Sequence, residues 1–302
     1  MKKKVSESTT GTVYALSAFV LWGILPVYWK LLQAVPAGEI LAHRIFWSAV
    51  FVTAVLVYMG RTNFSEILRN RRNRLSLLIT GILIGGNWFT YIYAVHTDRI
   101  VEASMGYYIN PLISIFLGLI VLKEKLNRVQ WISLMLATTG VLIITLQFGR
   151  IPWIALILSG SFGLYGLIKK IMNLDALSSL GIETLLLAPI AGGFIVIQAV
   201  NGTGAFLTMD YGIDALLIFS GAITALPLYW FAQSARRIPL SRIGFLQYIA
   251  PTLMLVMGVI GYREPFTTVH TISFGFIWAA LLLYSYSVFV VMRKYQDDPK
   301  SV

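Results

Sequence analysis

Three ionisable residues, Glu39, His43 and Arg44, lie close together in an otherwise apolar stretch of the chain. A spacing of four residues places Glu39 and His43 on one face of a helix, with Arg44 turned about 100° further. Charged groups inside an apolar helix are costly and usually functional. We therefore expect His43 and Arg44 to bind a substrate carboxylate or to form a gate. Two alternatives stay open, in which Arg44 reaches outward to the membrane surface or pairs with Glu39.

A fourth ionisable residue, Glu183, lies near the start of another apolar stretch and is, with His43, a candidate for proton coupling. A carboxylate inside a membrane gains or loses a proton as its surroundings change. The alternative is a carboxylate near the membrane surface that pairs with a neighbouring lysine or arginine. Glu102 is expected in a first helical turn, where the helix dipole favours an acid. Glu124 and Glu264 are expected to form turns or latches at helix ends.

Polar and aromatic residues near prolines are candidates for lining a substrate cavity. Proline leaves a backbone carbonyl without its helical donor and bends the helix, so Pro111 and Pro251 are candidate hinges or gates. For the aromatic residues the alternative is a belt at the membrane surface. The substrate-binding candidates, in addition to His43 and Arg44, are Trp22, Asn87, Trp88, Tyr108, Asn110, Gln247 and Tyr248.

The composition requires a membrane environment, because 57% of the 302 residues are hydrophobic and only 12% are charged. A soluble domain carries about 25% charged residues. An apolar stretch of about 20 residues spans a bilayer as a helix. We therefore expect an all-α integral membrane protein with ten transmembrane helices. The expected spans are 12–32, 37–59, 75–95, 101–122, 129–147, 151–171, 181–200, 214–235, 243–262 and 269–292.

The net charge of +11 indicates orientation in the bilayer rather than binding to nucleic acid. Nineteen of the 24 lysines and arginines fall on one side of the alternating spans, four fall on the other, and Arg44 lies within a span. Positive residues gather in cytoplasmic loops. The tails 1–11 and 293–302 are therefore both expected in the cytoplasm. With no cysteine and three histidines, the chain is expected to hold no metal and no cofactor.

An internal repeat appears when the chain is shifted by 140 residues without a gap. The shift places Trp22-Gly23 on Phe162-Gly163 and Lys123-Glu124 on Arg263-Glu264. Each copy contains five spans, so the second copy crosses the membrane in the opposite direction. Inverted repeats are typical of transporters whose substrate site lies between the copies. We expect a first repeat over 12–147 and a second over 151–292.

Four segments resemble the RarD proteins, which are bacterial permeases of the EamA family in the drug/metabolite transporter superfamily. The resemblance implies two inverted five-helix repeats in the bacterial plasma (inner) membrane. It also implies a cavity lined by helices 1–4 and 6–9, with helices 5 and 10 at the periphery as candidates for a homodimer contact. The segments are Glu39–Arg44, Ile84–Trp88, Glu102–Pro111 and Gln247–Thr252.

The predicted function is a secondary transporter that exports a small molecule by alternating access, with protons as a candidate coupling ion. RarD proteins are linked by name to chloramphenicol, and relatives export amino acids or other small metabolites. No nucleotide-binding motif is present. The alternative is an integral-membrane enzyme acting on lipid-linked substrates, for which the sequence supplies only scattered acids. A membrane scaffold or sensor is a third reading, for which no soluble output domain is present.

Overall fold

The structure is a computed structural model that describes residues 7–61, 64–97, 99–261, 263 and 267–297. The outer parts of both tails and Glu264 lie outside the described residues. The elements in chain order are α1 (Glu7–Leu31), α2 (Ala37–Tyr58), α3 (Phe64–Arg69), α4 (Arg71–His96), α5 (Ile100–Ile120), α6 (Arg128–Gln147), α7 (Trp153–Met172), α8 (Ala176–Val200), α9 (Tyr211–Ala235), α10 (Leu240–Gln247), α11 (Ile249–Val256), the π-helical turn η1 (Met257–Gly261) and α12 (Thr268–Asp297).

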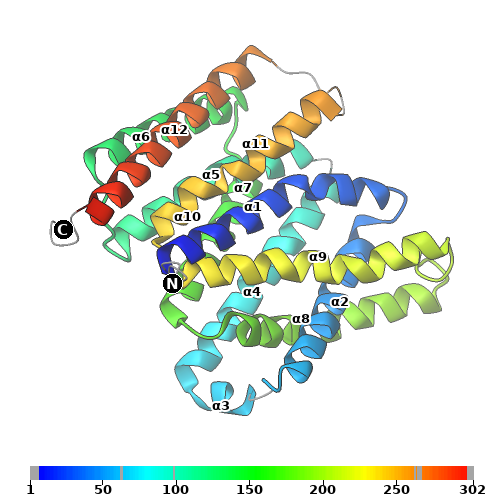
Figure 1. Ribbon diagram of the computed structural model, residues 1–302. Helices are drawn as coiled ribbons and strands as arrows, with labels where there is room; N and C mark the ends of the chain where they lie inside the picture. Colours follow the sequence, from blue (N-terminus) through cyan, green and yellow to red (C-terminus); the bar gives the residue numbers. More distant parts are fainter. Residues whose placement is uncertain (1–6, 62–63, 98, 262, 264–266, 298–302) are drawn as a thin grey trace.

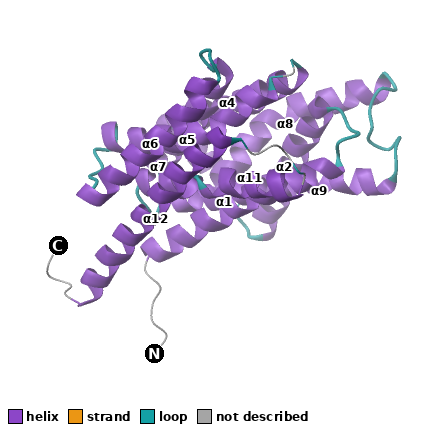
Figure 2. Ribbon diagram, turned by 90° about the horizontal axis from the view of Figure 1, so that it is seen from above, coloured by secondary structure: helices purple, strands orange, loops and turns teal. Residues whose placement is uncertain are grey.

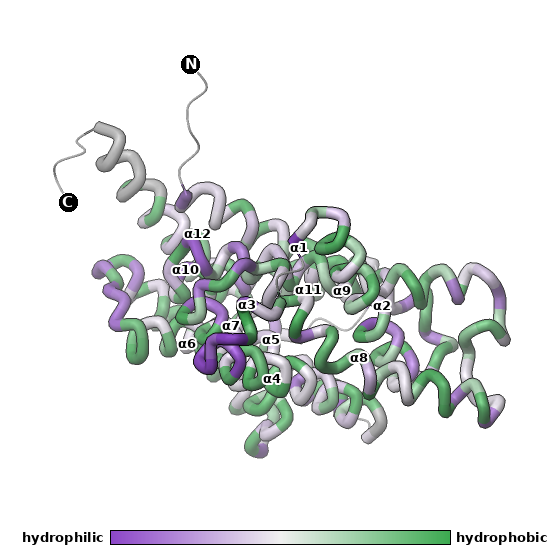
Figure 3. Tube along the Cα trace, turned by 90° about the horizontal axis from the view of Figure 1, so that it is seen from below, coloured by the Kyte–Doolittle hydropathy of each residue, from purple (hydrophilic) through white to green (hydrophobic). Residues whose placement is uncertain are grey.

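Ten helical segments are long and apolar enough to cross a membrane, which confirms the expected number of spans. The described residues form helices and connecting loops without strands (Figure 2). Figure 3 shows apolar residues along the helices. A chain in hydrocarbon must satisfy its backbone hydrogen bonds internally, and a helix does so within one segment.

Several helices begin before the apolar stretch that the sequence marks. The helices α4, α8 and α9 begin four, five and three residues ahead of their predicted spans. In each case a polar side chain, Asn70, Asp175 or Asp210, accepts hydrogen bonds from backbone N–H groups of the first turn. These caps satisfy N–H groups that have no partner inside the helix, so the helix extends into polar sequence.

The helix boundaries follow the predicted 140-residue repeat. The starts of α9, α10 and α12 lie 140 residues after the starts of α4, α5 and α6. Three pairs of equivalent helices also pack on each other: α2 on α8, α5 on α10, and α6 on α12. A helix that contacts its own counterpart lies beside the pseudo-two-fold axis. The two inverted repeats are therefore interlocked and do not form separate bundles.

The start of α1 and the end of α12 lie on the same side of the bundle (Figure 1). We call the side where α1 begins and α12 ends the terminal face, and the other the opposite face. The helices α6 and α12 run side by side at the edge (Figure 1). The fifth and tenth spans, which are α6 and α12, are thus peripheral, as the resemblance implies, and a homodimer through them stays a prediction.

The ninth span is interrupted, whereas the equivalent fourth span is continuous. The helix α10 ends at Gln247, and α11 begins at Ile249. Pro251 has no N–H to donate to the carbonyl of Gln247, which weakens the helix at this turn. Pro111 lies inside the unbroken α5. Of the two proline hinges that the sequence predicts, Pro251 therefore coincides with a break and Pro111 does not.

A close approach of α2 and α9 depends on Gly221. A Cβ atom at this position would collide with the backbone of Trp47 and Ser48. The hydroxyl of Ser48 also donates a hydrogen bond to the carbonyl of Gly221 over 2.9 Å. Because backbone atoms cannot move aside as a side chain can, only glycine allows this packing.

We predict that Gly221→Ala lowers the free energy of unfolding by about 1–3 kcal/mol, the usual cost of overpacking. Gly193→Ala is the matched control, because Gly193 lies in α8 with open space around it. Alanine favours helix over glycine, so this variant should be as stable as the parent or slightly more stable. Thermal unfolding in detergent measures both. Equal stability of the two variants would contradict the proposed close contact.

Candidate functional site

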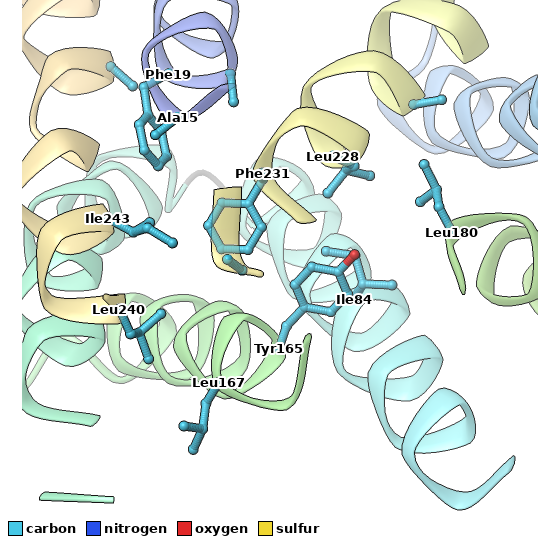
Figure 4. Close-up of a cluster of buried hydrophobic side chains, with 14 of the residues drawn as sticks. Ala15, Phe19, Ile84, Tyr165, Leu167, Leu180, Leu228, Phe231, Leu240 and Ile243 are labelled. Carbon is cyan, nitrogen blue, oxygen red and sulfur yellow. The ribbon is translucent and has the colours of Figure 1, made fainter. Parts of the chain in front are cut away.

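An aromatic cluster joins the two repeats near the middle of the bundle. Trp22 of α1 and its repeat equivalent Phe162 of α7 lie with ring centroids 5.6 Å apart. The ring of Phe231 lies 5.0 Å from Phe162 and 6.0 Å from Trp22. Figure 4 shows Phe231 of α9 between Phe19 and Tyr165. Contact between equivalent residues places this cluster at the pseudo-two-fold axis, where Trp22 is a predicted substrate contact.

Arg44 lies on the side of this cluster toward the opposite face, two helical turns into α2. Its guanidinium carbon lies 4.5 Å from the ring centroid of Trp29 and 5.7 Å from that of Trp88. Its Nε donates a hydrogen bond to the hydroxyl of Thr224 over 3.0 Å. Tyr107 also interacts with the guanidinium electrostatically. Residues of both repeats thus surround this cation.

Arg44 has no acidic partner among the described residues, where no Asp or Glu oxygen is recorded within ion-pair distance. Glu39 instead accepts hydrogen bonds from the backbone N–H groups of Ala205 and Phe206, over 2.7 and 3.1 Å. The structure therefore does not show the pair between Arg44 and Glu39 that the sequence left open. A partly buried guanidinium without a counter-ion is suited to bind an anionic group.

His43 lies on the same helix as Arg44 but faces a different set of residues. Its Nδ1 accepts a hydrogen bond from the indole N–H of Trp47 over 3.1 Å. Its Nε2 lies 3.9 Å from Glu39 and has no hydrogen bond, although His43 is buried. The ring lies 4.7 Å from that of Phe206. His43 thus keeps one polar atom available beside the loop that precedes α9.

A buried ion pair lies between Arg44 and the terminal face. The Nζ of Lys169 in α7 is 2.7 Å from Oε1 of Glu183 in α8, and both side chains are almost fully buried. The hydroxyls of Thr80 and Tyr165 donate to the same carboxylate over 2.5 and 3.3 Å. Lys169 also donates to the hydroxyl of Ser179. The sequence left open that Glu183 pairs with a basic residue near the membrane surface. Glu183 does pair with a lysine, but the pair is buried inside the bundle.

A second carboxylate connects the repeats at the terminal face. The two oxygens of Glu124, just after α5, accept hydrogen bonds from the N–H groups of Leu240 and Ser241 over 2.7 and 2.8 Å. They cap the first turn of α10, where the helix dipole favours negative charge. Glu102 has a similar role near the opposite face, where it accepts from the N–H of Ile154 and pairs with Arg99.

Three predicted contacts at the crossing of α5 and α10 have buried polar atoms without a hydrogen bond. These are Oδ1 of Asn110, both amide atoms of Gln247 and the hydroxyl of Tyr248. A buried polar group without a partner costs about 1–3 kcal/mol. Such a group is therefore expected to receive a partner at some point of the functional cycle, which agrees with a role in binding.

The remaining two predicted contacts have partners within the protein. Asn87 donates hydrogen bonds to the carbonyl of Leu158 over 2.8 Å and to the hydroxyl of Ser161 over 2.9 Å, which joins α4 to α7. The ring of Tyr108 lies 5.4 Å from that of Phe274, edge to face, in the peripheral helix α12. These arrangements account for both side chains by packing, and a contact with substrate stays a prediction for them.

The sequence patterns do not point to Trp29, Tyr107, Thr224 or Lys169. Lys169 falls in the last turn of a predicted span and is counted with the loop charges. The repeat offered a signal, because Trp29 is the equivalent of Lys169 and Tyr107 is the equivalent of Gln247. Inspecting the equivalents of the predicted contacts would have found Tyr107, whereas Trp29 and Lys169 are equivalent only to each other. Thr224 has no such signal.

Ten membrane spans in interlocked inverted repeats, with polar groups buried between them, have the architecture of a membrane transporter. The pattern of the EamA-like transporter family matches residues 9–146. The chain belongs to this family, within the drug/metabolite transporter superfamily. It is a multi-pass protein of the bacterial inner membrane.

Similar proteins align over nearly the whole chain. An uncharacterized transporter of Bacillus subtilis (strain 168), YojE, is 46% identical over 93% of this chain and 95% of its own. Protein RarD of Escherichia coli (strain K12) is 38% identical over 95% and 98%. A chloramphenicol-sensitive protein RarD of Pseudomonas aeruginosa is 27% identical over 95% and 97%. A crystal structure 16% identical to this chain has the same fold, with a TM-score of 0.70 over 90% and 96%.

We predict that Lys169→Met destabilises the protein by about 3 kcal/mol, because it leaves the Glu183 carboxylate buried without its cation. The double variant Lys169→Met with Glu183→Met should recover most of this loss, because apolar residues can replace a buried ion pair. Thermal or denaturant unfolding of the parent and of the single and double variants measures the coupling. Strictly additive effects of the two substitutions would contradict a direct interaction.

Proposed function

We propose that this protein is a secondary transporter that exports small amino-acid-like metabolites, or drugs such as chloramphenicol, by alternating access coupled to protons. The observation that carries the proposal is the Arg44 guanidinium, which lies between repeats without an acidic partner in the described part of the chain. The resemblance to metabolite exporters supports the direction. The chloramphenicol-sensitive relative supports the drug alternative.

The surroundings of Arg44 favour a substrate with a carboxylate and an apolar part. A guanidinium in partly apolar surroundings binds a carboxylate through two charge-assisted hydrogen bonds. The rings of Trp29 and Trp88 offer faces for an apolar part of the substrate. Amino-acid-like molecules have this combination, whereas chloramphenicol is neutral. The unsatisfied amide atoms of Gln247 would suit an amino or hydroxyl group.

Alternating access would follow from the inverted repeats. In this structure, buried side chains of Phe231, Tyr165 and Glu183 lie between Arg44 and the terminal face. The Glu124 cap also joins α5 to α10 there. Exchange of conformation between the two repeats would open these contacts and close the equivalent positions near the opposite face.

The positive charges of the loops support placing both termini in the cytoplasm, because nineteen lysines and arginines lie on the terminal side and four on the other. Arg44 would then lie on the outer side of the aromatic cluster, which is the side on which an exporter releases its substrate.

Glu183 is the proposed proton-coupling residue, together with His43. The ionised carboxylate holds Lys169 between α7 and α8. Protonation would neutralise Glu183 and weaken that attraction, so that α7 and α8 could separate near the terminal face. His43 occupies the equivalent position in the other repeat and also has an unsatisfied nitrogen. Glu183 would respond to the proton concentration on the terminal side of the membrane, and His43 would respond to that on the opposite side.

We predict that Arg44→Gln lowers uptake of carboxylate-bearing substrates at least tenfold in counterflow assays with proteoliposomes. Loss of a charge-assisted hydrogen bond costs about 1.5–3 kcal/mol, which corresponds to about 10- to 150-fold. A panel of labelled amino acids and chloramphenicol provides the substrates. Neutral substrates should be affected less, because they have no carboxylate.

The matched control is Arg150→Gln, which removes the same charge from a largely exposed side chain. It should leave transport unchanged. Equal loss of every substrate in folded Arg44→Gln protein would make this arginine structural. Unchanged carboxylate transport would remove it from the substrate site.

We predict that Glu183→Gln abolishes accumulation driven by a pH gradient but keeps substrate exchange. Glutamine resembles the protonated carboxyl and cannot release a proton. Uptake is measured with the gradient imposed and then collapsed, and exchange is measured at equal pH on both sides. Gradient-driven accumulation at the parent level would rule out Glu183 as the coupling residue.

A further inference from the structure

A cavity of about 290 Å³ lies at the terminal face, away from Arg44. It is formed by the loop after α5, the start of α10, the first turn of α6 and the middle of α12. Glu124, Lys125, Gln130, Arg242 and Tyr284 contribute to its walls. The cavity thus lies at the seam between the peripheral helices α6 and α12 and the remaining helices.

The depth of this cavity matches the headgroup layer of a bilayer. Arg242 lies two residues inside the span Leu240–Gly261, and Gln130 lies two residues inside Arg128–Gln147. Tyr284 lies about two turns before Met292, where the apolar sequence of α12 ends. Arg242 and Gln130 therefore lie within about one helical turn of the membrane boundary and Tyr284 within about two, close to the layer where tyrosine and arginine meet lipid headgroups.

The cavity is lined by two cations, Arg242 and Lys125, and one carboxylate, Glu124, so its walls carry a net positive charge. Both carboxylate oxygens of Glu124 already accept backbone hydrogen bonds from α10. Arg242 donates from Nη1 to the hydroxyl of Ser8, but its Nε is buried without an acceptor. No acidic oxygen is recorded in an ion pair with Arg242 among the described residues. Lys125 adds a second cation at the rim.

We propose that this cavity binds the phosphate of an anionic phospholipid from the leaflet at the terminal face. A phosphate oxygen would accept from the guanidinium of Arg242, and Lys125 would contribute the second charge. The side chains of Leu126 and Tyr284 supply apolar wall for the glycerol end of the lipid. Basic pockets between transmembrane helices at the membrane surface bind such headgroups. The cavity lies close to the membrane boundary and at the seam between the peripheral helices and the remaining helices. Both features favour a lipid headgroup over free phosphate as its ligand.

The test uses the full chain in nanodiscs of phosphatidylcholine that contain a minor fraction of phosphatidylglycerol. Native mass spectrometry after release counts the lipids that remain bound. The parent should retain phosphatidylglycerol in clear preference to phosphatidylcholine. The double variant Lys125→Gln with Arg242→Gln should lose this preference at least tenfold. Preference at the parent level in that folded variant would overturn the proposal.

The matched control removes two arginines from the same face outside the cavity, with Arg71→Gln and Arg72→Gln, and should keep the preference. Both side chains are exposed in the first turn of α4. If the double variant does not fold, Lys125→Gln alone, at an exposed position, should weaken retention measurably, and no change would overturn the proposal. A separate arm adds inorganic phosphate in detergent. Thermal stabilisation by phosphate without any by phosphatidylglycerol would also overturn the lipid assignment.

Discussion

Charge inside hydrocarbon must be matched, because an ionised group that has lost its water costs several kcal/mol unless a partner replaces it. The carboxylates of this bundle obey this constraint in different ways. Glu183 pairs with Lys169, Glu39 binds backbone N–H groups of the loop before α9, and Glu124 binds those of the first turn of α10. Arg44 differs from these carboxylates, because the recorded contacts of its guanidinium are with the hydroxyl of Thr224 and with aromatic rings. The arrangement of the helices follows these matches as much as it follows apolar packing.

The fold could be predicted from the sequence to a large extent because two physical regularities are strong. Hydrocarbon requires long apolar helices, and the interlocked repeat keeps equivalent helix starts 140 residues apart, as at Arg71 and Tyr211. Helix ends were harder to place, since caps such as Asp175 depend on local hydrogen bonds. The interruption at Tyr248 is predictable only in part, because Pro251 marks a candidate hinge but the equivalent Pro111 leaves its helix intact.

The site was less predictable because its contacts join segments far apart in the chain. His43 and Arg44 are conspicuous by their charge in an apolar stretch, but Thr224 becomes meaningful only when α9 packs on α2. Asn87 and Tyr108 have the residue types of a cavity lining, yet their recorded partners are Ser161 and Phe274. Residue type indicates what a side chain can do, and packing decides what it meets.

The packing of equivalent helices on each other has a consequence for how such a chain is made. When the ribosome has delivered only the first five spans, the faces of α2, α5 and α6 that later meet α8, α10 and α12 have no partner in the same chain. Lipid must cover them until the second half is inserted. A chain of half this length could cover the same faces only by pairing with a second copy inserted in the opposite orientation. Duplication within one gene fixes this relative orientation, which two separate chains would have to find by chance.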